Sequence, residues 1–209
     1  SMERIYLDNN ATTIVDPLVK DAMEPFFCKM YGNPNSLHTF GTEVHPYMRI
    51  AMDRLYAGIN APDEDDIIIN SCACEGNNTV IQGLYFHLLR MGGKRDTIAT
   101  TQVEHPSVMN AFKFLESIGV RVIYLPVNSD GIVTVQTLNE HLVPDRTALV
   151  SVMWANNETG LINPVKEISH YCREHGILFH TDAVQAVGKI PVSVQEIEPD
   201  FLTFSAHKF

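Results

Sequence analysis

The sequence predicts an α/β fold, in which a mostly parallel sheet carries helices on both of its faces. Short apolar runs rich in β-branched residues alternate with longer segments of helical periodicity along most of the 209 residues. Gly119 and Gly176 stand where a helix should end and the next strand should begin. Parallel strands need crossover connections, which are usually helical, so this alternation favours a sheet that is buried on both sides.

The elements follow from these patterns. Strands are expected at residues 66–70, 97–101, 120–125, 148–153, 177–180 and 201–204. Helices are expected at residues 17–31, 41–59, 75–91, 106–118, 135–142 and 165–175. The first helix has Asp16 as its N-cap and Pro17 at its first position, and the second is expected to bend at Pro46. Residues 5–7 should be extended, and residues 32–36 should form a loop.

Composition limits the class of protein. Hydrophobic residues make up 45% of the chain and charged residues 19%, which suffices for the core of one large domain. A formal net charge of -10 argues against nucleic acid and anionic membranes as partners, and no apolar run approaches the roughly 20 residues that span a bilayer. We expect no signal peptide, four free thiols and a reducing, cytoplasmic compartment. Cys28 and Cys172 should lie in the core.

Polar residues follow the ends of the predicted strands. They occur at positions 71–78, 104–106, 154–160, 180–185 and 205–208. The carboxyl ends of parallel strands meet at one edge of a sheet, where ligands bind, so these groups should share one site. The segment at 71–78 opens a helix, and the free backbone N–H groups of its first turn would bind a phosphate.

Two of these residues indicate the chemistry. Lys208 follows the last predicted strand, and Asp182 lies 26 positions upstream at the end of the preceding one. A lysine can form a Schiff base with pyridoxal 5'-phosphate, and an aspartate can pair with the pyridinium nitrogen of that cofactor. Cys72 and Cys74 have no second Cys or His pair at zinc spacing, so no metal site is predicted.

Six motifs occur in order along the chain: YLDNNATT at 6–13, GNPNSLH at 32–38, EH at 104–105, NNETG at 156–160, HTDAVQAVGK at 180–189 and SAHK at 205–208. In this order and spacing the chain resembles the pyridoxal-phosphate-dependent cysteine desulfurases of the nitrogen-fixation (NifS-like) type, within the class V aminotransferases. The resemblance covers essentially the whole chain. It implies the large domain of a pyridoxal-phosphate transferase of fold type I.

The resemblance implies a role for each site residue. Lys208 would hold the cofactor and move protons, His105 would stack on its ring and take part in proton transfer, and Asp182 would keep its nitrogen protonated. Asn157 and Gln185 would contact the phenolic oxygen of the ring. The groups expected to hold the phosphate are Ser205, His207 and the turn at Ala73 and Cys74. The residues expected at the substrate entrance are Asn10, Ala11 and Thr12.

The family commonly has Thr at the position of Cys74 and Gly at the position of Cys72. A thiol is a weaker hydrogen-bond donor than a hydroxyl, so the phosphate should depend more on backbone N–H groups here. In the family, the nucleophilic cysteine, a substrate-binding arginine and the smaller domain lie C-terminal to the lysine. We therefore expect an incomplete large domain at residues 16–209, preceded by a segment at 1–15 near the active site, that does not desulfurate cysteine by itself.

The implied reaction converts L-cysteine to L-alanine and leaves a persulfide for iron–sulfur cluster assembly. The implied partners are a second copy of the protein, in a homodimer, and an iron–sulfur scaffold protein that accepts the sulfur. Two alternatives stay open from the sequence. The first is a selenocysteine lyase, which shares the fold and the motifs, and the second is a non-catalytic cofactor-binding or dimerising fragment.

Overall fold

The computed structural model describes residues 4–208, and a parallel sheet forms its centre. Within these residues five strands lie in the order β2-β1-β3-β4-β5, and every neighbouring pair is parallel. The strands are β1 (Thr97–Thr101), β2 (Arg121–Leu125), β3 (Thr147–Ser151), β4 (Leu178–Asp182) and β5 (Phe201–Thr203). A helix joins each strand to the next along the chain, so the predicted α/β fold with a parallel sheet is confirmed.

The helices form the outer layers. The longer ones are α4 (His45–Gly58), α5 (Ala73–His87), α6 (Pro106–Ser117), α7 (Val135–His141) and α8 (Val165–Glu174). The short ones are α1 (Pro17–Met23), α2 (Pro25–Cys28), α3 (Thr39–Thr42) and α9 (Val194–Ile197). Three 3-10 turns complete the set, η1 (Leu89–Met91), η2 (Pro144–Arg146) and η3 (Ala206–Lys208).

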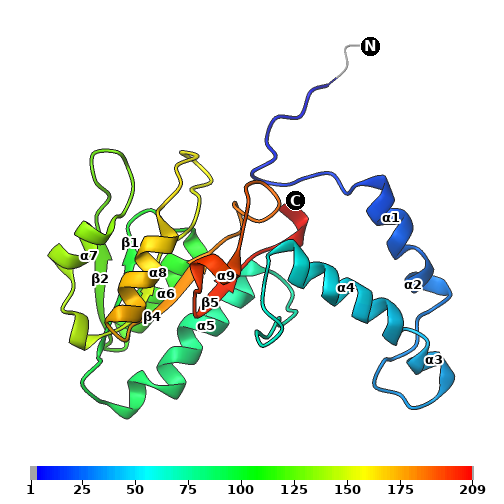
Figure 1. Cartoon of the computed structure of the whole chain (residues 1–209), viewed down its shortest axis with the longest axis horizontal. Helices are drawn as coiled ribbons and strands as arrows, with labels where there is room; N and C mark the ends of the chain where they lie inside the picture. Colours follow the sequence, from blue (N-terminus) through cyan, green and yellow to red (C-terminus); the bar gives the residue numbers. More distant parts are fainter. Residues whose placement is uncertain (1–3, 209) are drawn as a thin grey trace.

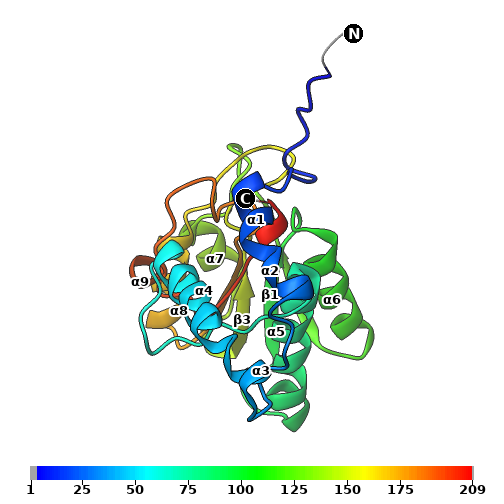
Figure 2. The ribbon, with the colours of Figure 1, turned by 90° about the vertical axis from the view of Figure 1, so that its right-hand side faces the viewer.

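Two hydrophobic cores lie on opposite faces of the sheet, between the layers visible in Figure 2. Side chains alternate across a strand, so neighbours in one strand enter different cores. Ile98 and Leu149 pack with α5 and α6, whereas Ala99 and Val150 pack with α7 and α8. This two-sided burial explains why the central strands read as continuous apolar runs in the sequence.

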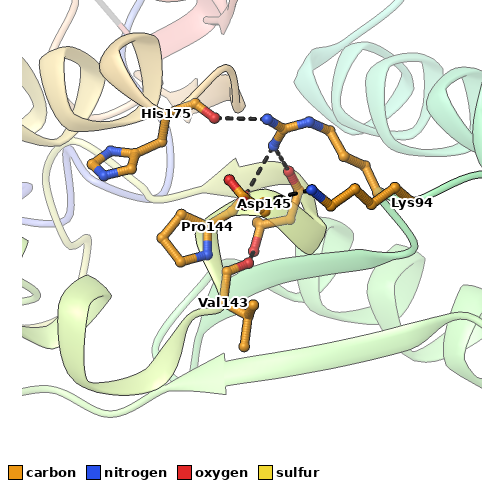
Figure 3. Close-up of polar contacts among 7 residues, drawn as sticks. Lys94, Val143, Pro144, Asp145 and His175 are labelled. Carbon is orange, nitrogen blue, oxygen red and sulfur yellow. Dashed lines mark hydrogen bonds and ion pairs between the residues drawn. The ribbon is translucent and has the colours of Figure 1, made fainter.

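The amino-terminal edge of the sheet is tied together by Arg95. Its guanidinium donates to the carbonyl oxygens of Pro144 (2.9 Å), Thr147 (2.6 Å) and His175 (2.7 Å), which precede or begin β3 and β4 (Figure 3). Gly176 follows in a left-handed conformation, with φ of +68°, and a Cβ there would lie 2.9 Å from the Arg95 guanidinium. The opposite, carboxyl-terminal edge is left free for a site.

The structure corrects three predicted elements. The helix expected at 17–31 is broken, because Pro25 lacks an N–H and begins the separate helix α2. The helix expected at 41–59 is α3 followed by α4, and Pro46 stands in the first turn of α4 instead of bending a longer helix. The strand expected at 66–70 is not formed, since no strand in the described residues pairs with it, and the side chains of Ile68 and Ile69 are exposed.

Smaller differences concern the ends of elements. The helix expected at 75–91 begins earlier, at Ala73, and its last turn is the 3-10 turn η1. Strand β4 reaches Asp182, two residues beyond the expected end, and α9 was not predicted. The N-terminal helices α1 to α3 lie to one side of the α/β body (Figure 1), and no described residue of α1, α2 or α4 is buried. No helix described here is both long and apolar enough to cross a membrane.

Candidate active site

A cavity of about 510 Å³, partly open to solvent, lies beyond the carboxyl ends of β3, β4 and β5. Most of the predicted site residues stand in its wall, namely Ala73, Cys74, His105, Asn157, Asp182, Gln185, Ser205, His207 and Lys208. They come together because parallel strands end at the same edge of a sheet.

The N-terminal segment reaches the rim of this cavity. The Asn10 side chain donates to the backbone carbonyl oxygen of Asn157 (3.1 Å), and the backbone carbonyl oxygen of Asn10 accepts from the Gln185 side chain (3.2 Å). Lys189 donates to both Asn10 and Gln185. Ala11 and Thr12 lie in a turn whose N–H groups donate to the carbonyl of Asp8, and they do not line the cavity. Their role at a substrate entrance stays a prediction.

The buried carboxyl group of the wall is that of Asp182, whose residue surface is 5% exposed. One carboxylate oxygen accepts from the backbone N–H of Val184 (3.1 Å), and the other accepts from the side-chain amide of Asn77 (3.2 Å). Burial raises the pKa of Asp182, while these two hydrogen bonds and the nearby His105 and Lys208 side chains oppose the rise. A buried carboxylate with so few donors is suited to a cationic partner in the cavity.

His105 is the N-cap of α6, and this position fixes its ring. The ring Nδ1 lies 3.1 Å from the backbone N–H of Ser107, which donates to it, and 2.9 Å from the Ser107 hydroxyl. Because Nδ1 accepts, the hydrogen of a neutral ring sits on Nε2. His105 therefore has a defined tautomer as well as a defined position.

The N-terminus of α5 forms another part of the wall. Cys72 is its N-cap, and no side-chain oxygen or nitrogen caps the helix, so the N–H groups of the first turn have only the weakly accepting Cys72 thiol beside them. Ala73 and Cys74, the first two residues of the helix, line the cavity beside Ser205 and His207. Such a helix start favours an anion and fits the predicted phosphate position.

A carboxyl group from the predicted polar segment 104–106, to which we had assigned no role, lies under the site. Glu104 is 8% exposed, and both its oxygens lie within reach of the Met153 N–H, at 2.8 and 3.1 Å. Burial, and then the charge of Asp182, raise its pKa from 4.5 to about 8, against hydrogen bonds from Thr101 and Met153. Glu104 is therefore a neutral acid at pH 7, which keeps a second negative charge away from Asp182.

We had assigned no role to two further polar residues of the wall, Asn77 and Ser107, although Asn77 lies in the predicted polar segment 71–78. Asn77 follows Ala73 by four positions, so a helical reading of 73–77 places both on one face, and this signal was present in the sequence. Ser107 is recognisable only as the residue that donates to the His105 ring.

The thiols fall into two groups. Cys172 is buried, as predicted, and burial raises its pKa to about 12. Cys28 is exposed on α2, so its predicted core position is wrong, because α2 packs no buried residue. Among residues 4–208, no three His, Cys, Asp or Glu side chains come together as metal ligands.

Known proteins resemble the chain over nearly its whole length. The pattern that defines the class V aminotransferases matches residues 5–209. A cysteine desulfurase of Nostoc sp. is 48% identical over 207 residues, which are 99% of this chain and 50% of the relative. The solved structure of a NifS-like protein superposes with a TM-score of 0.92 at 39% identity, covering 99% of this chain and 56% of that one. The structure of SspA in complex with cysteine superposes with a TM-score of 0.89 at 32% identity, covering 97% and 57%. The chain spans about half the length of the curated relatives it matches.

Proposed function

The chain belongs to the class V aminotransferase family, and from this we propose that its protein is a pyridoxal-5'-phosphate-dependent cysteine desulfurase. The proposed reaction takes L-cysteine and a protein thiol to L-alanine and a protein persulfide, so the sulfur moves from the substrate carbon to the thiol. We expect the accepting cysteine to lie C-terminal to Lys208.

One observation carries this proposal. A single cavity brings together an amine, a buried carboxylate, an imidazole and the uncovered N-terminus of a helix, in Lys208, Asp182, His105 and α5. These groups fit the aldehyde, the ring nitrogen, the ring face and the phosphate of pyridoxal 5'-phosphate in turn. When bound, this cofactor supplies an electron sink for the bond changes at the substrate.

The residues of the chain would supply binding and proton transfer. Lys208 would hold the cofactor at its aldehyde and carry a proton to or from the substrate carbon. Asp182 would stabilise a positive ring nitrogen, because a buried anion gains most from a cation in the same cavity. His105 has its Nε2 hydrogen free to donate, since Nδ1 is held by Ser107.

The proposed surroundings follow from the same resemblance. We propose a homodimer in the cytoplasm that passes sulfur to an iron–sulfur scaffold protein. Large apolar side chains that are exposed on α1, α2 and α4, such as Leu18, Phe27 and Tyr47, are consistent with further protein contacts.

The test uses the full-length protein that carries this sequence. The purified protein should show a visible absorption band of bound pyridoxal 5'-phosphate and form alanine from L-cysteine in equal amount to the sulfur transferred. Lys208→Ala should lose both, whereas Lys113→Ala, a change at an exposed lysine on α6, should keep both. Alanine formation that survives Lys208→Ala would contradict the proposal.

A further inference from the structure

Buried polar side chains link the middle of the sheet to Asp182. The Ser151 hydroxyl of β3 lies 2.7 Å from His180 Nδ1 on β4, and His180 Nε2 lies 3.3 Å from the Thr203 hydroxyl on β5. Thr203 lies 2.5 Å from the Asn77 side-chain oxygen on α5, and the Asn77 amide nitrogen lies 3.2 Å from Asp182. All four linking residues are buried, and Ser151 and His180 have no exposed surface.

Hydrogen counting gives this chain a direction. The Asn77 amide group donates to a carboxylate, so its oxygen must accept, and Thr203 therefore gives its only hydroxyl hydrogen to Asn77. Thr203 can then only accept from His180, which puts the His180 hydrogen on Nε2. His180 Nδ1 must accept from Ser151. Burial lowers the pKa of His180 to about 3, in keeping with the neutral ring that this pattern needs.

A second branch holds the same amide. The other N–H of Asn77 lies 3.1 Å from the Ser107 hydroxyl, which in turn donates to His105 Nδ1. The direction of this branch is fixed independently, because the backbone N–H of Ser107 already makes His105 Nδ1 an acceptor. The second branch therefore gives the Asn77 amide the orientation assumed for the first, with its nitrogen toward Asp182.

We propose that Ser151, His180, Thr203 and Asn77 are positioning residues, which form a one-way hydrogen-bond chain that keeps Asp182 a carboxylate before any ligand binds. The inference deepens the proposed function, since that function needs a negative Asp182. A proton on the Asp182 oxygen that faces Asn77 would need the Asn77 amide to turn over, and every hydrogen along the chain would have to reverse with it, while the other oxygen is held by the backbone N–H of Val184. The chain thus resists protonation of Asp182 as a unit.

Other charged groups also face Asp182. His105 from the start of α6 and Lys208 from η3 favour the carboxylate, and Glu104 opposes it when ionised. None of these three groups is part of the hydrogen-bond chain that runs from Ser151 to Asn77. Removing a hydroxyl from the hydrogen-bond chain therefore changes what holds the Asn77 amide in place and leaves the surrounding charges unchanged.

The experiment follows the Asp182 carboxyl directly. In the full-length protein freed of cofactor and labelled with carboxyl-¹³C aspartate, the Asp182 resonance is assigned by its loss in Asp182→Asn and titrated with pH. Thr203→Val keeps the side-chain shape but removes the hydroxyl, and it should raise the titration midpoint by about one to two pH units. Ser151→Ala should raise it by less, because His180 can then change tautomer and let the chain reverse.

Two control variants distinguish an effect of the hydrogen-bond direction on the Asp182 midpoint from an effect of side-chain packing. Thr203→Ser keeps the hydroxyl and should restore the parent midpoint. Thr181→Val makes the same isosteric change at the neighbouring β4 residue, which is fully buried and whose hydroxyl has no hydrogen-bond partner in the described structure, and it should leave the midpoint unchanged.

If both Thr203→Val and Ser151→Ala titrate Asp182 at the midpoint of the parent protein, the proposal is overturned. If Thr203→Val does not fold, the Asp182 midpoint in Ser151→Ala alone decides. The measurement needs neither cofactor nor turnover. A protein that fails to bind pyridoxal 5'-phosphate would refute the proposed function, while the Asp182 midpoints would still decide the proposal made here.

Discussion

Glu104 gives the sharpest test of the electrostatics under the site. Its carboxyl group is buried, and its pKa is raised to about 8 in the folded protein from an ordinary value of 4.5. Between these two values the folded protein holds a proton that the unfolded chain releases. Stability is therefore greatest below about pH 4.5 for this group, and it is lost as the pH rises toward about 8.

The magnitude follows from the distance between the two pKa values. Each pH unit in this window costs about 1.4 kcal/mol, so the whole window corresponds to about 5 kcal/mol. Between about pH 5.5 and about pH 7.5 the protein should lose about 3 kcal/mol of unfolding free energy through Glu104 alone. Such a loss is a large share of the total unfolding free energy of a domain, which is usually about 5–15 kcal/mol.

The variant that removes this dependence is Glu104→Gln. The amide is neutral at every pH, its oxygen can accept from the Met153 N–H, and its nitrogen can donate to the Thr101 hydroxyl. Urea unfolding of the cofactor-free protein can be followed by the fluorescence of Trp154, the one tryptophan of the sequence, which is buried beside the site.

At about pH 5.5 the parent and Glu104→Gln should be similarly stable, and at about pH 7.5 the variant should be more stable by about 3 kcal/mol. Glu174→Gln changes an exposed glutamate on α8 and should follow the parent at both values. If Glu104→Gln loses as much stability as the parent over this range, the raised pKa of Glu104 is refuted.

Three further outcomes can be checked. Arg95→Ala should lower the unfolding free energy by about 2–4 kcal/mol, since three carbonyl oxygens lose a charged donor, and Arg95→Lys should not restore it in thermal unfolding because an ammonium lacks the planar fork. Phe179→Ala should cost about 3–5 kcal/mol in the same measurement, because this ring is 1% exposed in the larger core. Under iodoacetamide, Cys72 should react well before Cys172. Hydrogen bonds from the Glu75 backbone and the Ser71 hydroxyl lower the pKa of the exposed Cys72 thiol, whereas burial raises the pKa of the Cys172 thiol. Peptide mass mapping of the alkylated protein shows which cysteine reacts first.

The central strands were predicted well because a strand that is buried on both faces has a continuous run of apolar or β-branched residues. Residues 97–101 are apolar or β-branched throughout, and β1 has the predicted bounds. The segment at 66–70 has a similar run in Ile67, Ile68 and Ile69, yet it forms no strand. A strand exists only with a partner, and a local pattern of apolar residues carries no information about which backbone lies beside it.

The break in the helix predicted at 17–31 has a cause that can be seen in the sequence, but the helical periodicity of the apolar residues outweighed it in the prediction. Pro25 interrupts the apolar pattern at 17–31, and a proline inside a helix removes one hydrogen bond and clashes with the preceding turn. Pro46 was read as a bend, but it occupies the first turn of α4, where a proline is well tolerated.

Most residues of the cavity wall could be predicted from the sequence, whereas the buried hydrogen-bonded residues behind the wall could not. The wall residues follow the carboxyl ends of strands, and a parallel sheet brings such residues together whatever the order of its strands. The support depends on register. His180 can meet Ser151 because the two pair across β3 and β4, and Thr203 stands beside Asp182 across β4 and β5. No spacing in the sequence shows either pairing.

One glycine connects the two parts of the site. A Cβ on Gly76 would lie 3.2 Å from the Thr203 methyl group and 3.1 Å from the Asn70 amide, so a side chain there would push α5 away from β5. The close approach brings the next residue, Asn77, within hydrogen-bond distance of both Thr203 and Asp182. It also sets the start of α5, with its uncovered N–H groups, in the wall of the same cavity. The helix that would hold an anion with its backbone therefore also holds the buried carboxylate in place with a side chain, so the two ends of a bound cofactor would be positioned by one rigid element.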